Sequence, residues 1–221
     1  MNRDKWDIIK KCAAGQPVES LPISLIIDSP WLPGYLGIST IDYFTIPDIW
    51  FKSNLQIEQD YPEIIFLPGF WVEYGMCAEP SAFGCRTSFF HDSTPQAHPM
   101  INSIDEIDRL EQPNPEKDGL LPLILNLYRR MEPRINDAGH LLKVVAARGP
   151  LATASHIMGV TNFLMGMIDK PEKTHQLLRM TTAFTKNWLE TQGSVLEDVE
   201  GIMVLDDLVG FVGPSSIPFD R

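Results

Sequence analysis

Four short apolar runs stand out along the chain. They cover residues 22–27, 63–67, 143–147 and 202–205, and each stops at a polar or turn-forming residue. Short apolar runs bounded in this way are typical of strands that are buried in a sheet. The pattern therefore predicts four buried strands.

The stretches between these runs carry helix signals. Apolar spacing, together with start and stop residues, predicts helices over residues 4–14, 39–59, 120–138, 153–168 and 169–191. Pro47 begins a second helical piece inside 39–59, because proline fits the first turn of a helix. Residues 29–34 hold two prolines and a glycine and are expected to form a loop.

Residues 70–102 are the least regular part of the chain. Several prolines and a glycine surround an alternating stretch, Arg86 to Phe90, which predicts a hairpin-like strand. Ser103 and Glu106 have the spacing of a capping box and predict the start of a short helix.

The order of these elements is a helix followed by four strand–helix units with inserts. Such alternation predicts an α/β fold with a parallel sheet and right-handed crossovers, in one domain covering residues 1–221. The four strands fit a small doubly wound sheet or half of an eight-stranded barrel. In both architectures the chemistry lies at the carboxyl ends of the strands.

Composition narrows the class of protein. The chain has 221 residues, 44% hydrophobic and 21% charged, with a net charge of −11. Such an acidic chain is not expected to bind nucleic acid or an anionic membrane. The sequence has no apolar segment long enough for a spanning helix and no secretory signal, and its three cysteines indicate free thiols, so a cytoplasmic location is expected.

The chain resembles the uroporphyrinogen decarboxylase family, including its corrinoid-linked methyltransferase branch. The matching stretches occur in the family's order and spacing, and they are residues 63–66, 73–84, 149–154, 169–192 and 206–214. The resemblance implies a (β/α)8 TIM-barrel fold of which this chain covers roughly the first half. A free half-barrel would leave two strand edges open. We therefore expect that the chain is a piece of a longer protein, that it pairs with another half in a homodimer or with a complementary half-barrel, or that it has closed differently.

The matched positions depart from those of the true decarboxylases. In that branch an arginine-rich loop after the first strand holds the carboxylates of the porphyrinogen, but residues 27–34 contain no arginine. The family's aspartate after the second strand falls near Pro68, its tyrosine falls at His156, and its serine falls at Asp207. The resemblance therefore favours the methyltransferase type over the decarboxylase.

The implied function is methyl transfer involving a corrinoid, which is a substrate or the cofactor of a partner corrinoid protein. The first alternative is a uroporphyrinogen decarboxylase of porphyrin biosynthesis, which is a lyase without a cofactor. The second is a non-catalytic half-barrel that acts as a binding module. The zinc ligands of the methyltransferase relatives are a His-x-Cys pair and a later cysteine. They lie beyond the matched region, so zinc is expected only if a further C-terminal part exists.

Three residues are candidates for catalysis. Asp206 and Asp207 follow the fourth strand, where one carboxylate of a close pair has a raised pKa and can act as an acid or base. The alternative for them is a helix cap or a solvated loop. His156 is a candidate proton shuttle on the helix after the third strand, and the alternative is a packed core histidine.

Four residues are candidates for binding a small-molecule substrate. Arg148 follows the third strand and can hold an anionic group, unless it forms a surface ion pair. Asp28 and Trp31 lie in the loop after the first strand, and Glu73 lies in a segment that matches the family. Packing is the alternative for Trp31, and a structural ion pair is the alternative for Glu73.

No metal site is predicted. The residues Cys77, Cys85, His91 and His98 do not have the spacing of a zinc finger, and prolines interrupt them.

Overall fold

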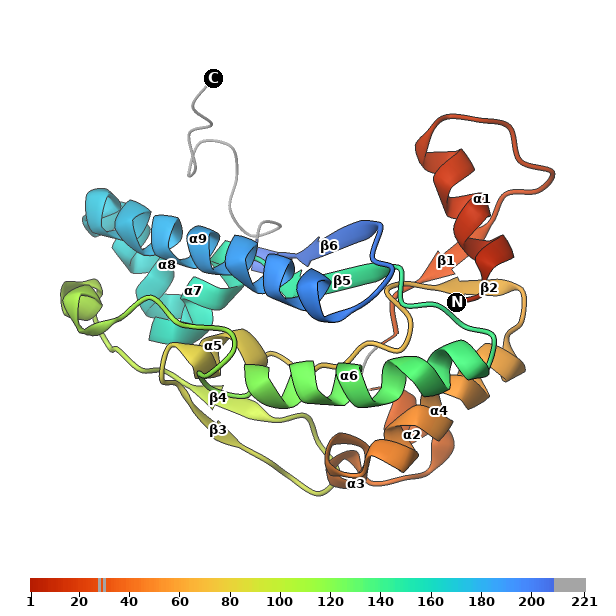
Figure 1. Ribbon diagram of the computed structural model, residues 1–221. Helices are drawn as coiled ribbons and strands as arrows, with labels where there is room; N and C mark the ends of the chain where they lie inside the picture. The colour runs from red at the N-terminus through yellow and green to blue at the C-terminus, as the bar shows by residue number, and fades with distance from the viewer. Residues whose placement is uncertain (28, 30, 209–221) are drawn as a thin grey trace.

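The computed structural model describes residues 1–27, 29 and 31–208 (Figure 1). Each of the four predicted strands is present. β1 (Ile23–Leu25) pairs in parallel with β2 (Ile64–Phe66), and β5 (Val144–Arg148) pairs in parallel with β6 (Gly201–Leu205). The predicted hairpin is formed by β3 (Arg86–Ser88) and β4 (Gln96–His98), which are antiparallel.

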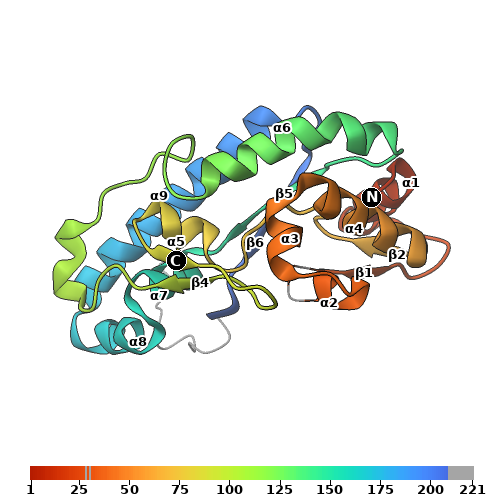
Figure 2. The ribbon, with the colours of Figure 1, turned by 90° about the horizontal axis from the view of Figure 1, so that it is seen from below.

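Helices follow β1, β2 and β5, as the alternation predicted, and the chain after residue 208 lies outside the described residues. The helices are α1 (Arg3–Ala13), α2 (Leu32–Leu36), α3 (Thr40–Thr45), α4 (Pro47–Asp60), α5 (Ala78–Ala82), α6 (Leu121–Asp137), α7 (Pro150–Met158), α8 (Val160–Asp169) and α9 (Pro171–Val195), with a 3-10 helix at Ile104–Arg109. Pro47 starts α4 as predicted. The elements α1 to α4, β1 and β2 lie at one end of the molecule and α7 and α8 at the other, with α6 extending between them (Figure 2).

Two local predictions are wrong. The expected helix over residues 153–168 is two helices, α7 and α8, which meet at an angle of 105°. Gly159 stands at the break with φ +82°, a conformation that glycine adopts without strain. The expected loop at residues 29–34 contains the start of α2, because Pro33 fits the first turn of a helix.

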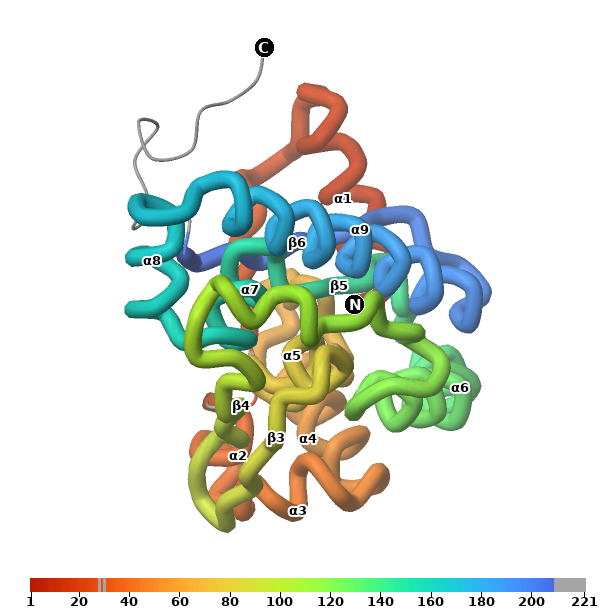
Figure 3. Tube along the Cα trace, turned by 90° about the vertical axis from the view of Figure 1, so that its left-hand side faces the viewer, coloured from red at the N-terminus to blue at the C-terminus, as the bar shows by residue number. Residues whose placement is uncertain are grey.

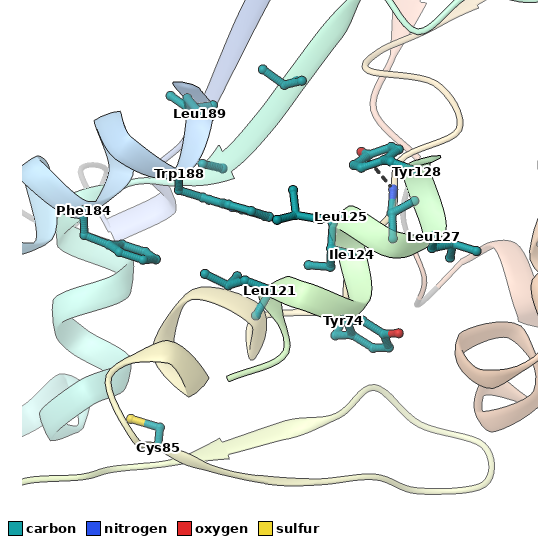
Figure 4. Packing of buried hydrophobic residues seen from close by; sticks show 14 of the residues in the cluster. Tyr74, Cys85, Leu121, Ile124, Leu125, Leu127, Tyr128, Phe184, Trp188 and Leu189 are labelled. Atoms are coloured by element: carbon teal, nitrogen blue, oxygen red, sulfur yellow. Dashed lines mark hydrogen bonds between the residues drawn. The ribbon is translucent and has the colours of Figure 1, made fainter. Parts of the chain in front are cut away.

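The main core lies between α6, α9 and β5. α9 runs along β5 and β6 in both views of the chain (Figures 1 and 3). Phe184 and Trp188 of α9 are fully buried and point toward Leu121 and Leu125 of α6 (Figure 4). Burying a side chain such as Phe184 contributes about 2 kcal/mol. A smaller cluster, which includes Trp6 and Val144, holds α1 against β2 and β5.

The outer strands are less buried than the sequence pattern predicted. Ile23 and Leu25 of β1 are 56% and 49% exposed, and Ile202 and Val204 of β6 are 68% and 46% exposed. Within the described residues each parallel pair has two strands only, so no closed barrel forms. An apolar strand is buried only when an element covers it, and nothing among the described residues covers these faces.

No single helix of the described chain is both long enough and apolar enough to cross a membrane. α7 and α8 reach the required length and composition only when taken together across their bend.

Candidate functional site

The carboxyl end of β5 places an arginine in the interior. Arg148 is the last residue of the strand and is 6% exposed. Its Nη2 donates to Glu73 Oε2 at 3.5 Å and to the Gly75 carbonyl oxygen at 3.4 Å, and its guanidinium lies 4.8 Å from the centre of the Trp71 ring. Such partners compensate a charge that has been removed from water. Within the described residues, Arg148 Nε has no hydrogen-bond partner.

Two buried carboxylates complete this cluster. Glu73 Oε1 accepts a hydrogen bond from the Ser29 backbone N–H at 2.8 Å, so Glu73 joins the loop after β1 to the end of β5. Glu79 Oε1 accepts from the Arg148 backbone N–H at 2.9 Å. Burial raises the pKa of Glu79, and the hydrogen bond and charge of Arg148 oppose that rise. Arg148, Glu73 and Glu79 together are called the β5 charge cluster below.

The space inside the β5 charge cluster is small. The cavity that these three residues help to line has a volume of about 10 Å³. A cavity needs about this volume to hold one water molecule. An organic substrate does not fit there, so the binding role predicted for Arg148 and Glu73 requires the cluster to open.

Asp206 caps α7. It follows β6 directly, and its carboxylate accepts hydrogen bonds from the backbone N–H groups of Leu151 at 3.0 Å and Ala152 at 2.8 Å. The close approach depends on Gly149, because a Cβ at that position would lie 2.3 Å from Asp206. Burial raises the pKa of Asp206 and the nearby Asp207 raises it further, whereas the two backbone hydrogen bonds lower it.

His156 and Asp207 lie on the more accessible side of this edge. His156 is half-buried on α7, and Asp207 is exposed directly after Asp206. Burial is the largest cause that lowers the pKa of His156, and the positive charge of Arg148 lowers it further, whereas Asp207 raises it. His156 is therefore within electrostatic reach of both charged residues, and its imidazole is neutral at neutral pH.

The other two candidates are Trp31 and Asp28, and the structure does not place them in this cluster. Trp31 is 45% exposed and stacks on Tyr35 with ring centroids 4.7 Å apart. It lines a cavity of about 690 Å³ beside β1 and β2, together with residues such as Leu25 and Phe66. Asp28 lies outside the described residues.

The structure thus brings five of the seven candidates to the carboxyl ends of β5 and β6. Arg148 contacts Glu73, Asp206 and Asp207 follow the neighbouring strand, and His156 lies on the helix that Asp206 caps. The sequence reading missed Trp71 and did not identify Glu79 as a partner of Arg148. The only signal for Trp71 was its place two residues before Glu73 in an irregular stretch.

Among the described residues, no group of three or more His, Cys, Asp or Glu side chains has the geometry to hold a metal ion. Burial raises the pKa of the Cys77 thiol to about 12 and that of Cys85 to about 11. Both thiols are therefore protonated at neutral pH, whereas metal binding uses the thiolate.

Comparison with known proteins identifies the class. The profile described as uroporphyrinogen decarboxylase (URO-D) matches residues 7–217. The chain belongs to the uroporphyrinogen decarboxylase family, which confirms the resemblance seen in the sequence. A search of the curated proteins finds no match.

A solved structure shares the fold. It is a methyltransferase from Methanosarcina mazei, with a TM-score of 0.74 and 17% sequence identity. The similarity covers 94% of this chain and 61% of that chain, so this chain spans less than two thirds of its neighbour's length.

Proposed function

We propose that the chain is part of a methyltransferase-type enzyme that moves a methyl group to or from a corrinoid. The observation that carries this proposal is the charge at the carboxyl ends of β5 and β6. Glu73 and Glu79 surround the buried Arg148, and Asp206 and Asp207 add further negative charge. A substrate with many carboxylates is repelled by such an edge, which disfavours the decarboxylase alternative.

The fold supports this assignment at the level of architecture. We propose that the chain forms the first half of a (β/α)8 barrel. The helices that follow β1, β2 and β5 along the chain, and the length of the solved neighbour, support this. The apolar side chains of β1 and β6 are exposed. This exposure supports the proposal that a complementary half-barrel or a second copy of the chain packs against these strands.

In the proposed reaction His156 acts as the base that removes a proton from the methyl acceptor. Its pKa is lowered, so a ring nitrogen is free to accept the proton that a methyl acceptor releases as its bond to the methyl group forms. The carboxylate of Asp207 stabilises the resulting imidazolium. Asp206 holds the start of α7, which carries His156. We propose that Asp28 and Trp31 contact the substrate from the loop after β1, and that Arg148 and Glu73 do so once their cluster opens.

The corrinoid enters this proposal as a substrate, carried free or on a partner protein. A zinc ion that activates a methyl-accepting thiol does not fit the described residues, since they supply no suitable set of donor side chains. No step is therefore assigned to zinc in this part of the chain. The free thiols Cys12, Cys77 and Cys85 support the proposed cytoplasmic location.

The test is a methyl-transfer assay with methylcobalamin as the methyl donor and 2-mercaptoethanol as the acceptor. The absorbance change of the corrinoid measures the reaction. We expect methyl transfer above the uncatalysed rate, a decrease of about 100-fold for His156→Gln, and an unchanged rate for His175→Gln, an exposed histidine of α9. Loss of carboxylates from uroporphyrinogen would instead establish the decarboxylase. If neither reaction occurs and light scattering shows a defined oligomer, the non-catalytic half-barrel is the better description.

A further inference from the structure

A further cavity lies between α3, the start of α4, the β3–β4 hairpin and α6. It has a volume of about 470 Å³, within the range of small-molecule sites. The turn of the hairpin reaches α3 below α6 (Figure 1), and the Ile41 backbone N–H donates to the His91 carbonyl oxygen at 3.2 Å. None of the lining residues belongs to the β5 charge cluster or to the Asp206–His156 edge.

Three aromatic rings form one wall of this cavity. Phe44 and Tyr74 have ring centroids 5.4 Å apart, and Phe89 lies edge-on to Phe44 at 6.4 Å and to Tyr74 at 6.0 Å. Leu123 of α6 lies among the lining residues and is 52% exposed. Large apolar side chains at a concave surface favour a ligand with a flat apolar body, because ring-to-ring contacts add to the burial of apolar area.

The Tyr74 hydroxyl lacks a partner. The ring of Tyr74 is largely buried, and no residue of the described chain forms a hydrogen bond with its hydroxyl, which lines the cavity. Its side chain lies beside α6, with the hydroxyl directed away from Leu121 (Figure 4). A phenol hydroxyl can donate one hydrogen bond to an acceptor that comes within reach. A lining tyrosine without a hydrogen-bond partner fits a ligand that brings an acceptor.

One cation lines the same cavity. Arg130 of α6 forms no ion pair within the part of the chain that the structure describes, since the nearby Asp48 carboxylate bonds to Arg134 instead. The amide of Asn126 also lines the cavity. The polar groups at this site are therefore a guanidinium, a phenol and an amide, which suits a carboxylate.

We propose that this cavity binds a small aromatic carboxylic acid, whose ring packs against Phe44 and Phe89 and whose carboxylate pairs with Arg130 and accepts a hydrogen bond from the Tyr74 hydroxyl. The site is independent of the proposed methyl transfer, because the two share no residue.

Titration with 3-phenylpropionate, observed by ligand NMR and calorimetry, tests the proposal. For a ligand of this size we expect saturable binding with a dissociation constant of about 1 mM. Tyr74→Phe keeps the ring and removes the hydroxyl, and we expect about five-fold weaker binding. Arg130→Gln is expected to weaken binding about ten-fold, whereas Arg129→Gln, the adjacent arginine that does not line the cavity, leaves it within about two-fold.

Two further ligands separate the contributions of ring and charge. The neutral 3-phenylpropanol and the aliphatic hexanoate are each expected to bind about five-fold or more weakly than 3-phenylpropionate. Absence of saturable binding up to about 20 mM overturns the proposal. Binding that Tyr74→Phe and Arg130→Gln leave unchanged, or equal binding of the alcohol, also overturns it. Melting temperatures of the variants that match the parent show that any loss is local.

Discussion

Gly149 stands between β5 and α7, directly against Asp206. Its backbone angles, φ −72° and ψ 167°, are accessible to any residue, so space alone restricts this position. In Gly149→Ala the new Cβ would lie 2.3 Å from both Cβ and Oδ2 of Asp206. Because Cβ is fixed to the backbone, rotation of the Asp206 side chain does not relieve the clash, and the residue must shift.

The cost follows from the contacts that Asp206 makes. A displaced carboxylate no longer accepts the N–H groups of Leu151 and Ala152, now at 3.0 and 2.8 Å. Loss of the helix cap costs about 1 kcal/mol, and leaving a buried N–H without a partner adds about 1 kcal/mol. We therefore expect Gly149→Ala to lower the free energy of unfolding by about 2 kcal/mol.

Urea unfolding followed by tryptophan fluorescence measures this difference. Gly193→Ala is the matched control, because Gly193 lies in α9 with nothing within 4 Å of the added Cβ, and it should raise the free energy of unfolding by about 0.5 kcal/mol. The reasoning is refuted if Gly149→Ala is as stable as the parent. It is also refuted if the substitution costs as much in an Asp206→Gly background, where the clashing side chain is gone.

The buried Arg148 ion pair, His156 and the edge strand β6 give three more predictions. Arg148→Met removes the guanidinium that faces the buried Glu73 carboxylate and should lower the free energy of unfolding by about 3 kcal/mol in the same urea assay. An unchanged free energy of unfolding would contradict a structural role for the pair. The folded-state pKa of His156 is lowered, so the folded protein binds fewer protons than the unfolded chain, and stability should fall as pH decreases below about 6.5. His156→Gln should make this fall shallower and leave the contribution of His140, whose pKa is also lowered, whereas an identical pH profile would contradict the assignment. Ile202 lies on an exposed face, so Ile202→Glu should change the free energy of unfolding by less than about 0.5 kcal/mol. If a second copy of the chain covers β6, light scattering should show that this variant is a monomer. An oligomer unchanged by the substitution would exclude a second copy at β6.

The strand order was predictable because each strand is a short apolar run with a clear stop. Burial of the outer strands was not, since an apolar run looks the same whether a neighbour covers it or not. Ile202 is apolar and 68% exposed for this reason. The break at Gly159 was missed because apolar spacing continues through it, and spacing along one segment carries no information on a change of helix direction.

The site was predictable where it depended on strand ends. Arg148 and Asp206 meet the same edge because parallel strands end together, as expected from their positions after β5 and β6. The contact between Arg148 and Glu73 spans 75 positions, and Glu73 lies in an irregular stretch without periodicity. Sequence reasoning therefore found both residues but not their pairing, nor the Trp71 ring beside them.

The double attachment of Glu73 has a mechanical consequence. One of its carboxylate oxygens holds the Ser29 backbone and the other faces the Arg148 guanidinium. Among the described strands no ladder of backbone hydrogen bonds joins β2 to β5. At this edge the two parallel pairs are instead joined through the contacts of Arg148 with Glu73, the Gly75 carbonyl oxygen and the Trp71 ring. An anion that replaced Glu73 at the Arg148 guanidinium would break the contact between these two side chains. The distance between the β1–β2 pair and the β5–β6 pair would then depend on the bound anion.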